Sequence, residues 1–175
     1  MKKSFGAKET KIILIILVII FFIVEKLLLN NIIRVEGVKF GLYNLFIIFA
    51  IININPKFAF LLFGAKLALG IVFISTAVIY PLFGGLLSLA AMVLAYRTGK
   101  GKMGYIGIGI IGALVYNITV YAAAAISVSS SAVFYNTPQM LILSVLIGGA
   151  TGSLAFLLSK SNIFVLNDGG SDEKK

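Results

Sequence analysis

Residues 103–128 read MGYIGIGIIGALVYNITVYAAAAISV and contain no charged side chain. A transmembrane helix needs about 20 consecutive apolar residues, so this stretch is long enough to cross a bilayer. The rest of the chain has the same character: 60% of its 175 residues are hydrophobic and 12% are charged. Soluble domains average about 45–50% apolar and about 25% charged residues. We therefore expect the bilayer to be the solvent for most of this chain.

Five further apolar segments lie on either side of this stretch, bounded by prolines or by polar residues. They predict an all-α protein, an integral membrane bundle of six transmembrane helices. The expected spans are residues 11–30, 38–54, 57–76, 81–96, 103–128 and 138–160. The expected organisation is a short N-terminal segment, one six-helix transmembrane domain and a polar tail, at residues 1–10, 11–160 and 161–175.

Basic residues are distributed unevenly between the segments that connect these spans. Cytoplasmic connections of membrane proteins are enriched in Lys and Arg, so the distribution predicts a multi-pass protein of the cell membrane with both termini cytoplasmic. Because the basic residues flank apolar spans, the net charge of +9 indicates contact with anionic lipid and not with nucleic acid. The residues assigned to the cytoplasmic side are Lys2, Lys3, Lys8, Lys11, Lys57, Arg97, Lys100, Lys102, Lys160, Lys174 and Lys175.

The residue inventory excludes several classes of chemistry. The chain has no Cys and no His, which removes thiol catalysis, disulfides, Ser-His-Asp triads and nearly every zinc site. The loop at residues 99–102 reads GKGK and lacks the frame of an ATP-binding P-loop. We therefore expect no enzyme activity, no metal and no cofactor.

Four polar side chains fall within or at the edge of the expected spans: Glu25, Lys39, Lys66 and Asn117. An ionisable group inside a membrane is costly, so it usually pairs or has a function. At about 1.5 Å per helical residue, three of these side chains fall in the outer half of the bilayer and Lys66 near its middle. They predict a shared pocket that opens outward, and the excess of basic side chains there favours an anionic or polar ligand.

Each of these residues also has a structural explanation that the sequence leaves open. Lys39 can extend to lipid headgroups, and Glu25 can pair with a lysine only to hold helices together. Asn117 can bond a neighbouring helix. Pairs of small residues four apart indicate close helix packing inside the bundle, or else docking of a partner: Gly84 and Ser88, Gly109 and Ala113, Gly148 and Gly152.

Residues 36–44, EGVKFGLYN, resemble the PGVKLGLAN signature of the Gx transporter family, which is also labelled heptaprenyl diphosphate synthase component I. Glu25 matches an acidic residue of that family, and Lys66 falls where the family has an arginine. Three more segments match in the same order: residues 83–92, FGGLLSLAAM, residues 112–117, GALVYN, and residues 148–152, GGATG. The resemblance spans nearly the whole chain.

This family resembles the S components of energy-coupling factor (ECF) transporters. The resemblance implies a six-helix subunit that binds a small vitamin- or cofactor-like solute on the outer side. It also implies partners that drive release, namely a membrane T component and two ATPase subunits. Residues 31–37 would form a lid over the pocket. The expected substrate-binding residues are Glu25, Lys39, Tyr43, Asn44, Lys66, Tyr116 and Asn117.

Two other functions remain open at this stage. The family's older label implies an accessory membrane subunit in prenyl diphosphate or quinone metabolism. A small channel or passive transporter is the third possibility.

Overall fold

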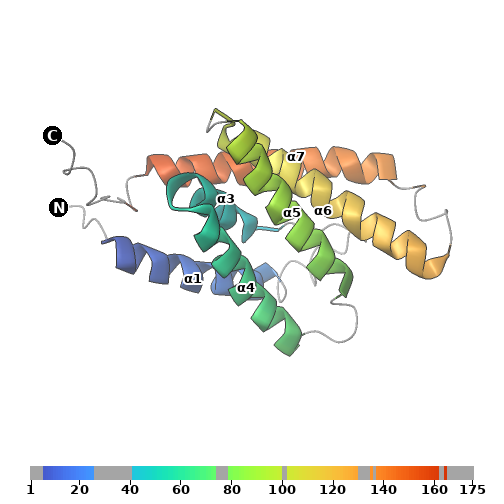
Figure 1. The fold of residues 1–175 in the computed structure, drawn as a ribbon, viewed down its shortest axis with the longest axis horizontal. Coiled ribbons are helices and arrows are strands. Elements are labelled where there is room, and N and C mark those ends of the chain that lie inside the picture. The colour runs from blue at the N-terminus through green and yellow to red at the C-terminus, as the bar shows by residue number, and fades with distance from the viewer. Residues whose placement is uncertain are drawn as a thin grey trace.

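The computed structural model describes residues 6–25, 41–73, 79–99, 102–129, 135, 137–161 and 164. Within these residues it contains six α-helices and no strand, so the all-α prediction is confirmed (Figure 1). The helices are α1 (Ala7–Val24), α3 (Asn44–Asn53), α4 (Pro56–Phe73), α5 (Ile79–Thr98), α6 (Tyr105–Val128) and α7 (Thr137–Lys160).

Two of these helices have the length and apolar composition needed to cross a membrane, α6 over Tyr105–Ser127 and α7 over Thr137–Lys160. Six membrane crossings are not confirmed. The expected second span differs most from the structure, because α3 has only 10 residues. At about 1.5 Å per residue it is about 15 Å long, half the thickness of a bilayer core. Residues 41–43, which lie within the expected span, form a turn, and residues 38–40 lie outside the described residues.

The short helix α3 forms the centre of the bundle. Its residues from Leu45 to Ile51 are all buried, with at most 7% of any side chain exposed. It contacts α1, α4, α5, α6 and α7, and Figure 1 shows it between α1 and α7. The Phe46 ring packs edge-on against Phe21 of α1, with ring centroids 5.0 Å apart. Because α3 is apolar on every face, its position inside the bundle buries its apolar side chains on all sides.

Helices α6 and α7 approach each other through glycines. A Cβ atom on Gly109 would lie 2.3 Å from the carbonyl oxygen of Gly148, and one on Gly152 would lie 2.6 Å from the Cα atom of Ile106. We call Gly109, Gly148 and Gly152 the glycine seam. Lipid gives helices no hydrophobic drive to associate, so backbone contacts of this kind supply packing energy instead.

The remaining small-residue pair joins α5 to α6. A Cβ atom on Gly84 would lie 2.7 Å from Val120, and the Ser88 hydroxyl donates to the carbonyl of Gly112 at 2.7 Å. All three pairs of small residues therefore pack inside the bundle, as their spacing indicated.

Exposed basic side chains gather at one end of the bundle, which we call the basic end. Tyr105 at the start of α6 is hydrogen-bonded to Asn53 at the end of α3 and to Ser159 near the end of α7. Figure 1 shows that α1 begins and α7 ends on the same side. The exposed basic residues at these helix ends are Lys8, Lys11, Lys57, Arg97, Lys102 and Lys160.

Candidate functional site

A tight turn at residues 41–43 leads into α3, at the end of that helix away from the basic end. Gly41 has a φ of 58°, in the left-handed region that favours glycine, and its carbonyl accepts a 2.8 Å hydrogen bond from the amide of Asn44. The buried carboxylate of Glu25 accepts hydrogen bonds from the amides of Gly41 at 2.9 Å and Leu42 at 3.0 Å. The carboxylate thus holds the turn in place through charge-assisted hydrogen bonds to two backbone amides that precede α3.

Lys66 of α4 contacts the same turn through Tyr43. Its ammonium donates to the Tyr43 hydroxyl at 2.5 Å and lies 3.9 Å from the centroid of that ring. The Tyr43 ring also packs edge-on against Phe22 of α1, with centroids 6.3 Å apart. The turn is therefore held from two sides, by α1 through Glu25 and by α4 through Lys66.

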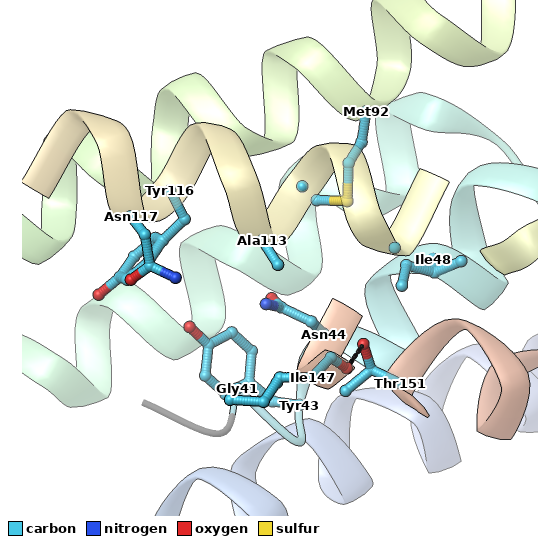
Figure 2. Close-up of a pocket in the computed structure, with 12 residues that line it drawn as sticks. Gly41, Tyr43, Asn44, Ile48, Met92, Ala113, Tyr116, Asn117, Ile147 and Thr151 are labelled. Carbon is cyan, nitrogen blue, oxygen red and sulfur yellow. Dashed lines mark hydrogen bonds between the residues drawn. The ribbon is translucent and has the colours of Figure 1, made fainter. Parts of the chain in front are cut away.

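A pocket opens between this turn and helices α3, α5, α6 and α7 (Figure 2). About 460 Å³ of space lies between its atoms, counting the part that opens to the surroundings. The room free for a whole molecule is little more than that of one water. The lining residues are Gly41, Tyr43, Asn44, Ile48, Met92, Gly109, Gly112, Ala113, Tyr116, Asn117, Ile147 and Thr151.

Polar side chains occupy the part of the pocket between the turn and α6. Figure 2 shows the amide of Asn44 and the hydroxyl of Tyr43 pointing up toward α6, from which Tyr116 and Asn117 project down. Asn117 also donates from Nδ2 to the Ser144 hydroxyl of α7 at 2.6 Å. Asn117 therefore bonds a neighbouring helix and lines the pocket at the same time.

The structure brings together four of the residues predicted to bind substrate: Tyr43, Asn44, Tyr116 and Asn117 all line the pocket. Glu25 and Lys66 are not among its lining residues and contact the turn instead. Lys39 and the expected lid at residues 31–37 lie outside the described residues. No charged side chain lines the pocket among the residues that the structure describes. The binding role of the seven residues remains a prediction.

The other lining residues are apolar or small, and sequence reasoning based on polar groups did not select them. Most nevertheless lie in the segments that resemble family signatures: Gly41 in residues 36–44, Met92 in residues 83–92, and Thr151 in residues 148–152. The lining residues outside those segments are Ile48, Gly109 and Ile147. The motif segments were therefore a better guide to this pocket than ionisable residues were.

The fold and the pocket define a helical protein with a cavity between apolar helices, lined by a few polar side chains among apolar ones. The family model of heptaprenyl diphosphate synthase component I matches residues 14–158, and the chain belongs to this family. This confirms the family assignment that the resemblance predicted. No curated protein and no solved structure matches the chain. Family membership and the apolar helices together indicate a membrane protein.

Proposed function

We propose that the chain is the solute-binding membrane subunit, or S component, of an energy-coupling factor type importer. One observation supports this above all: four segments that resemble family signatures converge on a single pocket from distant parts of the chain. Residues 36–44, 83–92, 112–117 and 148–152 each contribute lining side chains. A concave site with a few convergent polar groups among apolar ones is typical of small-molecule binding.

The lining residues favour an uncharged, polar part of a solute. Amide and phenol groups both donate and accept hydrogen bonds, and Asn44 and Tyr116 present such groups. Ile48, Met92 and Ile147 supply an apolar wall for a flat or hydrocarbon portion. A vitamin- or cofactor-like molecule has both features. The narrowness of the pocket requires that side chains or the turn shift when the solute enters.

In this proposal other chains supply the energy for transport. The sequence has no P-loop, so a membrane T component and two ATPase subunits would drive release. The basic end would face the cytoplasm, where its exposed lysines meet anionic lipid headgroups. Both termini would then be cytoplasmic, and the protein would be multi-pass. The chain would bind the solute and leave it chemically unchanged.

The family's description favours one alternative, an accessory membrane subunit in prenyl diphosphate or quinone metabolism. Such a subunit would support a synthase without being one. Prenyl transfer needs carboxylates that hold magnesium and diphosphate, and the described residues contain no group of three or more His, Cys, Asp or Glu side chains that could bind a metal.

Affinity purification from native membranes in a mild detergent separates the two proposals. The importer proposal predicts that the tagged chain brings down one apolar membrane protein and two ATPases. Recovery of a soluble prenyl synthase without ATPases would contradict it and support the alternative. Ion flux through the purified chain alone in liposomes would instead indicate a channel.

A further inference from the structure

Two polar side chains of the pocket are each hydrogen-bonded to a residue that does not line it. Tyr43 is bonded to Lys66 of α4, and Asn117 is bonded to Ser144 of α7. A side chain that accepts a hydrogen bond on one side keeps its own proton to donate on the other, and a side-chain amide held by its nitrogen keeps its oxygen to accept. These two outer contacts therefore determine what the pocket offers to a solute.

The Tyr43 hydroxyl is left with a proton to donate. The Lys66 ammonium donates to this hydroxyl at 2.5 Å, and an ammonium cannot accept a hydrogen bond in return. The phenolic proton has no acceptor among the residues that the structure describes. Figure 2 shows the hydroxyl pointing across the pocket toward α6. Tyr43 thus faces a solute as a hydrogen-bond donor.

The Asn117 amide is held in one orientation by Ser144. The Ser144 hydroxyl donates its proton to the carbonyl of Met140 at 2.6 Å, so toward Asn117 it can only accept. Asn117 Nδ2 supplies that hydrogen bond, also at 2.6 Å. Oδ1 of the same amide has no partner within the described part of the chain and is left to accept from a solute. Ser144 does not line the pocket, so it acts as a positioning residue.

An ionic group would gain little at this part of the pocket. Glu25 and Lys66 contact the turn from outside the pocket and carry opposite charges, so their fields partly offset each other there. An ion would lose its hydration without a charged partner among the described lining residues, which is costly. A carboxylate, which only accepts, would face Asn117 Oδ1, and an ammonium, which only donates, would face the Tyr43 proton.

We propose that Lys66 and Ser144 fix the hydrogen-bond pattern of the pocket, with Tyr43 donating and Asn117 accepting, so that the pocket selects a neutral group with an acceptor beside a donor. The CO–NH edge of a cyclic amide has this pattern. The Asn44 amide carries both roles and completes the contacts. The inference rests on the proposed function, because it names the class of solute that the same pocket takes.

Two probes that differ only at the amide nitrogen test this pattern. Carbostyril is a flat bicyclic amide with a CO–NH edge, and N-methylcarbostyril has a methyl group in place of the amide proton. Equilibrium dialysis of the chain in nanodiscs, with empty nanodiscs as the blank, gives both affinities. The parent chain should prefer carbostyril about fivefold or more, because the methylated probe has no proton for Asn117 Oδ1. Naphthoate, a bicyclic anion that only accepts, should also bind about fivefold or more weakly than carbostyril.

Ser144→Ala tests whether the positioning of Asn117 creates this preference. The substitution removes the hydroxyl that holds Nδ2, so the amide can turn over and present either atom to the probe. The preference for carbostyril should fall to about twofold or less. A general loss of helix packing would weaken both probes alike and leave their ratio unchanged. Ser153→Ala is the matched control on α7, because its hydroxyl bonds the carbonyl of Gly149 within the helix, and it should keep the parent ratio.

Tyr43→Phe tests the donor on the opposite side of the pocket. The variant keeps the ring that packs on Phe22 and should lower the affinity for carbostyril about fivefold. Tyr135→Phe is the matched control, because Tyr135 is 90% exposed and does not line the pocket; it should leave the affinity unchanged. If Tyr43→Phe fails to fold, Ser144→Ala decides the outcome.

Three results would overturn the proposal: no binding of carbostyril to the folded parent chain, equal binding of the two amide probes, or an unchanged preference in folded Ser144→Ala. Native mass spectrometry of the parent chain and Asn44→Ala tests separately whether the pocket binds a solute at all. If Asn44→Ala loses a retained solute while the parent shows no preference between the probes, the hydrogen-bond pattern is wrong and the proposed binding function stands.

Discussion

Helices α6 and α7 contact each other at the glycine seam, and the pocket lies directly beside that seam, with Gly109 part of both. Gly148 faces the seam, where a Cβ atom would lie 2.6 Å from the carbonyl oxygen of Gly109. Its neighbour Ile147 lines the pocket, as does Ala113, which follows Gly109 by one turn of α6. The same two helices thus hold the bundle together with backbone contacts and leave space for side chains beside them.

We expect the glycine seam to contribute to the stability of the bundle and the pocket to contribute to solute binding. At the seam the packing is apolar and complete, so any added atom disturbs it. At the pocket the polar groups of Asn44 and Tyr116 point into a narrow cavity and not into a helix contact, so we expect that removing one leaves helix packing intact. Substitutions in the two regions should therefore have different effects, and each of the following experiments tests that separation.

The largest effect is expected at the seam. In Gly148→Ala the new methyl group would lie within 3 Å of backbone atoms of Gly109 and Ile110. Overpacking of this kind costs about 1–3 kcal/mol, and rigid backbone on both sides favours the upper end. Thermal unfolding in detergent should show a clear fall in melting temperature. The matched control is Gly149→Ala, where no atom lies within 4 Å. Equal melting temperatures for the two variants would show that the seam does not hold α6 to α7.

The next largest effect is expected at the turn. Glu25→Gln replaces one of the two acceptor oxygens with an NH₂ group, so the amide of Gly41 or Leu42 loses its partner. Hydrogen bonds to charged groups contribute about 1.5–3 kcal/mol. Amide hydrogen exchange at residues 41 and 42 should accelerate about tenfold or more. Glu9→Gln, which alters an exposed cap on the same helix, should leave exchange at the turn unchanged. Slow exchange in the Glu25 variant would contradict the role of its carboxylate in holding the turn.

A smaller effect is expected where α5 meets α6. Ser88→Ala removes the hydroxyl that donates to the carbonyl of Gly112, a residue that also lines the pocket. Side-chain hydrogen bonds between membrane helices contribute about 0.6 kcal/mol on average. The melting temperature should fall slightly, by less than in Gly148→Ala. A loss as large as that at the seam would mean that polar contacts, and not glycine packing, dominate the stability of the bundle.

The helical fold and the packing of small residues followed from the sequence because both depend on local patterns. Apolar runs predict helices, and small residues four apart predict close contacts between them. The family-like segments also led to the pocket, since residues 112–117 contain Tyr116 and Asn117. These features require no knowledge of how distant segments meet.

The observed contacts of Glu25 and Lys66 did not follow from the sequence. Depth along a helix gives no direction around its axis, and it predicted that both side chains enter the pocket. The turn at residues 41–43 places backbone amides and the Tyr43 hydroxyl next to them instead. That turn depends on the left-handed conformation of Gly41, which no hydrophobic pattern reveals. The shortness of α3 escaped prediction for the same reason.

The most direct test of the account is native mass spectrometry of the gently purified protein and of its Asn44→Ala variant. We expect the parent chain to retain a small molecule. Asn44→Ala should retain at least fivefold less of that molecule, with an unchanged melting temperature. Tyr116→Phe should show a smaller loss, because it keeps the ring and removes one hydroxyl. Ser153→Ala, which does not line the pocket, should retain the molecule fully. Retention of the same amount of solute by folded Asn44→Ala would contradict the assignment of this pocket as the binding site.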